Sequence, residues 1–128
     1  PPTEPLPQDV GVSVVIRSSD NRIVMGGYSQ YTSGSCITLS CYNTDGSLYT
    51  SFGVGGKVLA SPTFSSFIVN DVILQPNDYI IVTGSFSSLQ PSIFVTRFDS
   101  FGVLDTSFGI SGYVIITPSN FGTQFDQW

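Results

Sequence analysis

The sequence predicts an all-β protein made of two copies of one four-stranded unit. Three observations support this fold class. A stretch at residues 46–58 returns 56 residues later, at 102–114, with eight identical positions out of thirteen. Short apolar segments alternate with turns rich in Gly, Asn and Asp, and no helical periodicity of useful length interrupts them. Only 10% of the residues are charged, while Ser, Thr, Gly and aromatic residues are frequent, as is typical of strands.

The repeated stretch is the strongest of these signals. Its two copies read GSLYTSFGVGGKV and GVLDTSFGISGYV, and both contain an unbroken Thr-Ser-Phe-Gly. Such a dense match at a fixed period indicates a repeat protein.

The chain opens with a Pro-rich segment. Residues 1–9 read PPTEPLPQD and hold four prolines with little to bury. We expect an extended, polyproline-like arm or linker there.

In the first copy, four strands are expected, at residues 10–16, 22–27, 36–42 and 57–60. Valine and isoleucine alternate with other residues in the first, and glycines close the second. Turns are expected at 18–21 and 43–46, and a polar loop at 29–35.

The second copy is expected to follow the same course, with strands at residues 67–74, 79–84, 92–98 and 113–117. Ile16 aligns with Ile73 and Gly27 with Gly84 at an offset of 57, whereas the later half aligns at 56. The loop between the second and third strands is therefore expected to be one residue shorter in the second copy.

Four short strands in a unit of this length are typical of a propeller blade. We divide the chain into a first repeat at 10–66, a second at 67–117, and a tail at 118–128 that corresponds to the start of a third. A single sheet cannot cover both of its faces, so each unit must stack on a neighbour. Two units share one interface and leave two outer faces open.

The repeated residues resemble the delta-60 repeat family over about residues 12–117. The run at 43–58 matches the family's Gly-rich signature, and 20–27 and 77–84 match the strand pair that precedes it. Tyr49 departs from the pattern, because the family favours an acid there, as at Asp105. Ser100-Phe101 likewise replaces the usual Asp before a glycine. The resemblance implies tandem β-propeller-like repeats without an assigned catalytic activity.

The signature residues are expected to pack neighbouring units together. The aromatic side chains would fill the interface, and the glycines beside them would allow the backbone to turn. The residues concerned are Phe52, Gly53, Gly56, Phe108, Gly109 and Gly112.

Several classes of chemistry are disfavoured. The chain has no histidine, which removes Ser-His-Asp and Cys-His catalysis and the common zinc ligand sets. The acidic residues fall mainly in turns, where Asp usually caps its own backbone. Residues 43–47 resemble half of a calcium loop but lack the closing Glu. We therefore expect no enzymatic activity, no metal and no cofactor.

Charge and hydropathy narrow the range of partners that the chain could bind. Four basic residues against nine acidic ones give a net charge of −5, too few cations for a nucleic-acid surface. No apolar run approaches the roughly 20 residues of a membrane helix, so membrane insertion is not expected.

Cys36 and Cys41 lie in one expected strand. At about 3.3 Å per residue their Cα atoms would be roughly 16 Å apart on opposite faces. A disulfide needs Cα atoms within about 7 Å, so the two are not expected to pair with each other. They are interpreted as small semi-buried side chains, with an intermolecular bridge as the alternative.

These features favour a non-enzymatic structural or interaction module whose partners are copies of itself or neighbouring repeats of a longer chain. Its composition suits a large surface, secreted or virion protein. The alternative is a carbohydrate-binding module that uses aromatic side chains in loops or tails, which could equally contact a protein. The candidate aromatic residues are Tyr28, Tyr31, Tyr49 and Trp128.

Overall fold

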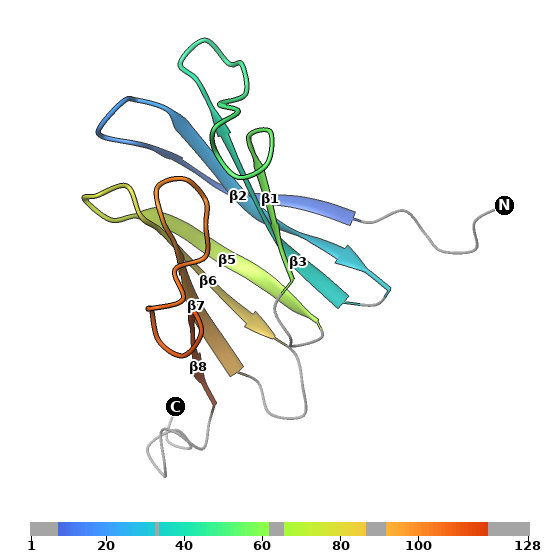
Figure 1. Cartoon of the computed structure of the whole chain (residues 1–128). Helices are drawn as coiled ribbons and strands as arrows, with labels where there is room; N and C mark the ends of the chain where they lie inside the picture. The colour runs from blue at the N-terminus through green and yellow to red at the C-terminus, as the bar shows by residue number, and fades with distance from the viewer. Residues whose placement is uncertain (1–7, 33, 62–65, 87–91, 118–128) are drawn as a thin grey trace, which may run out of the picture.

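A computed structural model describes residues 8–32, 34–61, 66–86 and 92–117, which form two four-stranded antiparallel sheets (Figure 1). The all-β fold class is confirmed. In these described ranges there is no helix of the length and apolar character needed to cross a membrane.

Both sheets have their strands in sequence order, joined as simple meanders. The strands of the first sheet are β1 (Gln8–Ile16), β2 (Ile23–Tyr31), β3 (Gly34–Tyr42) and β4 (Lys57–Ala60). The strands of the second are β5 (Phe67–Leu74), β6 (Ile80–Phe86), β7 (Ser92–Phe98) and β8 (Tyr113–Ile116). We call the first sheet with its loops blade 1 and the second sheet with its loops blade 2.

Two expected boundaries in blade 1 were wrong. β1 begins at Gln8, so the last residues assigned to the Pro-rich arm belong to a strand. Most residues of the polar loop expected at 29–35 are paired between strands instead, because β2 continues to Tyr31 and β3 begins at Gly34. Polar side chains are accommodated there, since Ser29 Oγ donates to Asp9 Oδ1 at 2.5 Å across β1 and β2. Residues 1–7 of the arm and the tail at 118–128 lie outside the described residues.

The first turns of the two blades differ in length. Ile16 pairs with Ile23 at the end of the first hairpin of blade 1, and Leu74 pairs with Ile80 in blade 2. Ile16 therefore corresponds to Leu74, and its alignment with Ile73 was wrong. The turn at 17–22 is one residue longer than that at 75–79, and a gapless alignment conceals this insertion.

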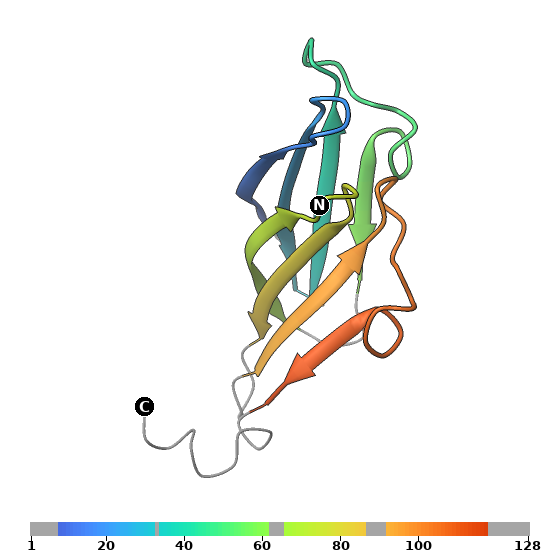
Figure 2. The same cartoon turned by 90° about the vertical axis from the view of Figure 1, so that its left-hand side faces the viewer.

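The core lies between the two sheets, which form two layers (Figure 1); in Figure 2 the sheet of blade 2 lies in front of that of blade 1. β5 packs against β1, β2 and β3. A Cβ at Gly26 would lie 2.5 Å from Val72 Cγ2, so the bare glycine allows the sheets to approach closely. The Phe67 and Phe94 rings meet edge to face at 5.3 Å between centroids. The core side chains with 0% exposure include Val24, Ile37, Cys41, Phe52, Ile80, Val82 and Phe94.

Candidate functional site

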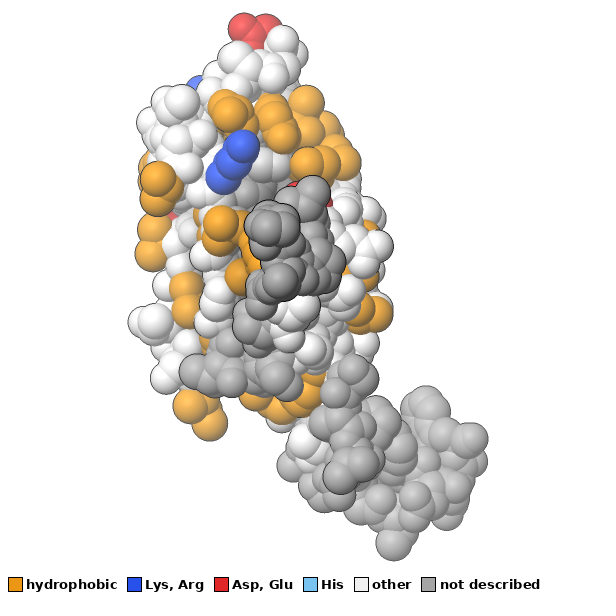
Figure 3. All heavy atoms as spheres, turned by 90° about the vertical axis from the view of Figure 1, so that its right-hand side faces the viewer, with side chains coloured by type: hydrophobic (Ala, Val, Ile, Leu, Met, Phe, Trp, Pro, Cys, Tyr) orange, Lys and Arg blue, Asp and Glu red, His pale blue; other side chains and the backbone are white. Residues whose placement is uncertain are grey.

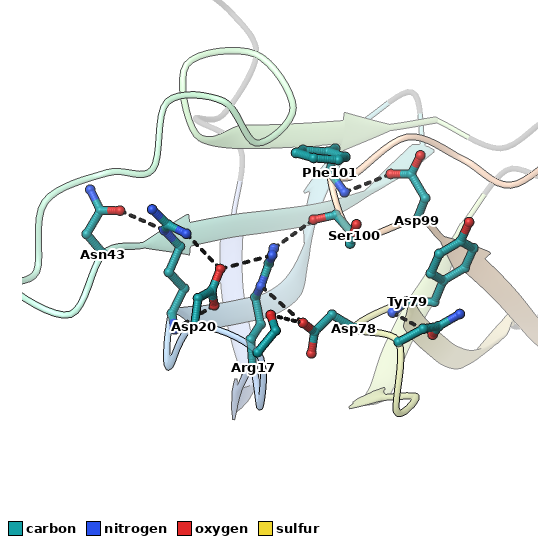
Figure 4. Close-up of polar contacts among 11 residues, drawn as sticks. Arg17, Asp20, Asn43, Asp78, Tyr79, Asp99, Ser100 and Phe101 are labelled. Carbon is teal, nitrogen blue, oxygen red and sulfur yellow. Dashed lines mark hydrogen bonds and ion pairs between the residues drawn. The ribbon is translucent and has the colours of Figure 1, made fainter.

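The candidate site comprises the junction between the blades and the two sheet faces turned away from it. The β1–β2 and β5–β6 turns and the long loops at 43–56 and 99–112 all emerge at the same end of the molecule (Figure 1). Figure 4 shows polar contacts between the blades at that end. Two further contacts lie along the sheets, where Ser13 Oγ donates to the Val72 carbonyl at 3.3 Å and the Phe67 N–H donates to Ser35 Oγ at 3.1 Å.

Arg17 connects the blades from the longer turn of blade 1. Its Nη1 donates to the Ser100 carbonyl of blade 2 at 2.7 Å, and its Nε lies 3.9 Å from Asp78 Oδ2. Its Nη2 lies 3.1 Å from Asp20 Oδ2. The Arg17 and Asp78 side chains are only 7% and 6% exposed. Desolvation offsets much of the attraction in such a pair, so the pair is expected to add little net stability, although removing one partner would leave a buried charge unpaired.

Asp78 also accepts a hydrogen bond from the Ser19 hydroxyl of blade 1. Its backbone φ is 64°, in the left-handed region that Asp and Asn tolerate better than most residues. Asn21 holds the corresponding place in blade 1, with φ 59°. Both turns therefore share this left-handed residue, while an ion pair joins the two blades only once among the described residues.

Asp20 remains a carboxylate at this end. Burial alone would raise its pKa, but hydrogen bonds from the Arg22 backbone N–H and guanidinium, with the charge of Arg17, hold the pKa below its ordinary value. The Asp20 Oδ2 to Arg22 Nη1 distance is 2.7 Å.

The signature of blade 1 packs against blade 2. Phe52 is fully buried, and a Cβ at Gly102 would lie 3.0 Å from its Cζ. The Gly53 N–H donates to the Phe101 carbonyl at 2.8 Å. Phe52 and Gly53 therefore hold the 99–102 turn of the next blade.

The other signature glycines act within their own loops. A Cβ at Gly56 would lie 3.0 Å from Leu48 Cδ2, and one at Gly112 would lie 2.9 Å from Leu104 Cδ1. Both have positive φ, so glycine suits their conformation as well as their close packing.

The signature of blade 2 has no such neighbour among the described residues. Phe108 is half-buried and lies beside Arg97, whose guanidinium carbon is 4.9 Å from the ring centroid. Gly109 lacks a counterpart of the bond between Gly53 and Phe101 within the described backbone. At Gly46, which corresponds to Gly102, a Cβ would meet nothing within 4 Å.

The outer face of blade 1 carries a groove with a volume of about 470 Å³. Met25 on this face is 38% exposed, whereas its counterpart in blade 2, Val82, is 0% exposed in the core. Hydrophobic side chains reach the surface on the side of the molecule shown in Figure 3. We call this surface the open face of blade 1; the side chains that line its groove include Met25, Tyr31, Thr38, Tyr42, Lys57 and Leu59.

The outer face of blade 2 is also apolar. Ile93 is 45% exposed, whereas its counterpart in blade 1, Ile37, is 0% exposed between the sheets. Ile73 and Val114 are exposed on the same face. We call the surface formed by Ile73, Ile93 and Val114 the open face of blade 2.

The four candidate aromatic residues do not come together. Tyr28 was expected in a loop but lies on β2, with its side chain partly buried against the core. Tyr31 also lies on β2, on the open face of blade 1. Tyr49 lies in the loop at 43–56 beneath the Arg22 guanidinium, 3.7 Å from the ring centroid. Trp128 lies outside the described residues.

Tyr42 is an aromatic residue of the groove that the sequence reasoning missed. It sits at the end of β3 on the same face as Tyr31. The alternation of buried and exposed positions along β3 would have found it, since Cys41 points to the core and Tyr42 to the other face.

The turn carboxylates are engaged by their own loops. Asp45 Oδ1 accepts from the Ser47 N–H and hydroxyl, which lower the pKa of Asp45. Asp99 Oδ1 accepts from the Phe101 and Val103 N–H groups. No group of three or more His, Cys, Asp or Glu side chains within the described ranges could hold a metal ion.

Both cysteines are free thiols on β3. Cys41 is in the core, and burial raises the pKa of its thiol. Cys36 is half-buried, with its Sγ 3.0 Å from Ser61 Oγ.

A comparison with protein families matched the β-propeller domain of unknown function DUF5122 at residues 18–52 and 75–108. A search of curated proteins and a search of solved structures found no match. The two matched segments start in the first turn of each blade, end at the signature residues Phe52 and Phe108, and together cover more than half of the chain. The chain therefore belongs to the DUF5122 β-propeller family.

Proposed function

We propose that this chain is a non-enzymatic structural or interaction module that associates with further blades of its own kind. Those blades belong to copies of the chain or to neighbouring repeats of a longer protein. One observation carries the proposal: each open face corresponds, position by position, to a face that the chain buries at its own junction.

The correspondence runs in both directions. Met25 and Val14 form a cross-strand pair on the open face of blade 1, where blade 2 buries Val82 and Val72. Ile93 on the open face of blade 2 stands where blade 1 buries Ile37. Burial of these exposed apolar side chains would supply the driving force for association.

We assign the signature at 43–58 and 99–114 to the delta-60 repeat, on the residues that match that pattern. An interaction module of low charge, with strands rich in Ser and Thr, suits a large surface, secreted or virion protein. The lack of histidine and the engagement of Asp45 and Asp99 by their own loops support a role without catalysis.

The mass of the protein in solution tests this function. Light scattering after size exclusion is expected to give a multiple of the 13.7 kDa chain. A mass that stays at one chain as the concentration rises would argue against association between copies.

A carbohydrate-binding module is the second candidate, because the groove of blade 1 carries two tyrosines. Tyr31 and Tyr42 line it together with Thr38, Ser40 and Lys57, and this mixture of rings and polar groups suits a sugar. Binding on a glycan array that is lost in Tyr31→Ala and Tyr42→Ala would favour this function. Ile73→Ala on the other open face is the matched control. Glycan binding that survives both tyrosine substitutions would exclude the groove as the binding site.

A further inference from the structure

We propose that two copies of this chain dock head to tail, with the open face of blade 2 of one copy on the open face of blade 1 of the second copy. The proposal rests on the proposed function and adds the partner, the polarity of the contact and the residues that make it. The junction within the chain is the template, since the interface between copies would continue it.

An aromatic ring and a glycine define the centre of the contact. Within the chain, Phe52 of one blade lies under Gly102 of the next. Between copies, Phe108 takes the place of Phe52 and the second copy's Gly46 takes that of Gly102. Gly46 has the same conformation as Gly102, with φ 91° against 83°, and the space within 4 Å of its Cβ position is empty. A half-buried ring on one face thus matches an unfilled place on the other.

A backbone hydrogen bond accompanies this ring. The Gly53 N–H donates to the Phe101 carbonyl inside the chain. The corresponding groups between copies are the Gly109 N–H and the second copy's Asp45 carbonyl. Gly109 and Gly53 share their left-handed conformation, with φ 59° and 56°, so the donor is presented by the same local backbone.

At the polar end of the contact between copies, two amides would take the place of the ion pair that the junction within the chain contains. Arg17 corresponds to Gln75, because each N–H donates to the last carbonyl of its turn, that of Arg22 or Tyr79. Asp78 corresponds to Asn21. Gln75 would therefore face the second copy's Asn21, and each amide can both donate and accept. This exchange avoids burying an unpaired charge between copies.

The contact uses two different faces, so it is heterologous and repeats from copy to copy. It ends in a closed ring when the rotation between blades permits closure. Propellers close with about four to eight blades, which corresponds to two to four copies of a two-bladed chain.

Two single substitutions test the polarity. Met25→Glu places a charge on the open face of blade 1, and Ile93→Glu places one on the open face of blade 2. Both side chains are exposed in the single chain, so each variant is expected to fold with a melting temperature close to that of the unchanged protein. Each variant alone is expected to be a monomer by light scattering. An equimolar mixture is expected to form a 1:1 dimer, because each variant retains the face that the other needs.

The possible outcomes distinguish a failure of association between copies from a failure of the head-to-tail contact alone. If the unchanged protein is a monomer, association between copies fails, and this inference fails with it. If the unchanged protein associates but either variant alone still forms dimers, the copies join through like faces and the head-to-tail contact is wrong. A mixture that stays monomeric while the unchanged protein associates would overturn the proposed pairing of faces.

Discussion

The guanidinium carbon of Arg22 lies 3.7 Å from the centroid of the Tyr49 ring, and blade 2 makes the same kind of contact with other residues. The corresponding positions there hold Tyr79 and Asp105. Arg97 from β7 lies 5.4 Å from the Tyr79 centroid, and its Nη2 is 2.7 Å from Asp105 Oδ2. Tyr49, which stands where blade 2 has Asp105, therefore belongs to an exchange of partners that keeps a cation against an aromatic ring in both blades.

Alanine substitution of the two signature phenylalanines should cost more unfolding free energy where the ring is buried between the blades than where it is only half-buried. Phe52→Ala is expected to lower the free energy of unfolding by about 3–5 kcal/mol, because the ring is fully buried. Phe108→Ala should cost less in a single chain, since its ring is half-buried. Urea unfolding in the Met25→Glu background measures both on the monomer. Equal losses there would contradict the difference in burial.

Two glycines offer a matched pair of alanine substitutions. Gly102 and Gly46 both have positive φ, so alanine strains both backbones similarly. A Cβ at Gly102 would also lie 2.7 Å from Val58 Cγ2, whereas a Cβ at Gly46 meets nothing. Gly102→Ala is therefore expected to lower the melting temperature of the monomeric background more than Gly46→Ala does. A larger effect of Gly46→Ala would contradict the packing at this turn.

The ion pair between the blades should show strong coupling. Arg17→Met leaves the Asp78 carboxylate buried without its cation and is expected to cost about 3–5 kcal/mol in unfolding free energy. Asp78→Asn keeps a residue type that tolerates the left-handed backbone. The double variant should then be more stable than the two separate losses predict, as a double-mutant cycle by urea unfolding would measure. Additive losses would mean that the two side chains act independently.

Acid should destabilise the protein partly through Asp105. A hydrogen bond from the Ser107 hydroxyl, with the Arg97 guanidinium beside it, holds the pKa of Asp105 below its ordinary value. A carboxyl whose pKa is lower in the folded state stabilises the fold above its unfolded pKa, and this contribution is lost as the pH falls through the folded value. Asp105→Asn should therefore flatten the fall in melting temperature as the pH drops below about 4, the ordinary range of an Asp carboxyl. An unchanged slope would contradict this role.

Local patterns in the sequence predict most of the fold. The two copies of the signature reveal the period, and β4, β5 and β7 begin and end where alternation and turns place them. The extension of β2 to Tyr31 could not be read from polarity, because cross-strand partners supply the hydrogen bonds of the polar residues there.

The site was harder to predict, because it depends on contacts between residues distant in sequence. Nothing local to Arg17 indicates that its side chain crosses to Ser100 and Asp78 in the next blade. The one-residue insertion in its turn is also hidden, since it becomes visible only when the pairing of Ile16 with Ile23 is known. The role of Phe52 was accessible because its motif repeats.

The longer first turn places Arg17 at the internal junction only, and this asymmetry bears on how the molecule comes apart. Arg17 pairs with Asp78 between the two blades of one chain, while Gln75, with its neutral amide, holds the corresponding position on blade 2. If copies associate as proposed, heating is expected to separate them before it separates the blades of one chain, because those blades are joined covalently and share the buried core. We expect the pair of blades, rather than the single repeat, to melt as a unit, because a cut between β4 and β5 would leave two halves that each expose their share of the core.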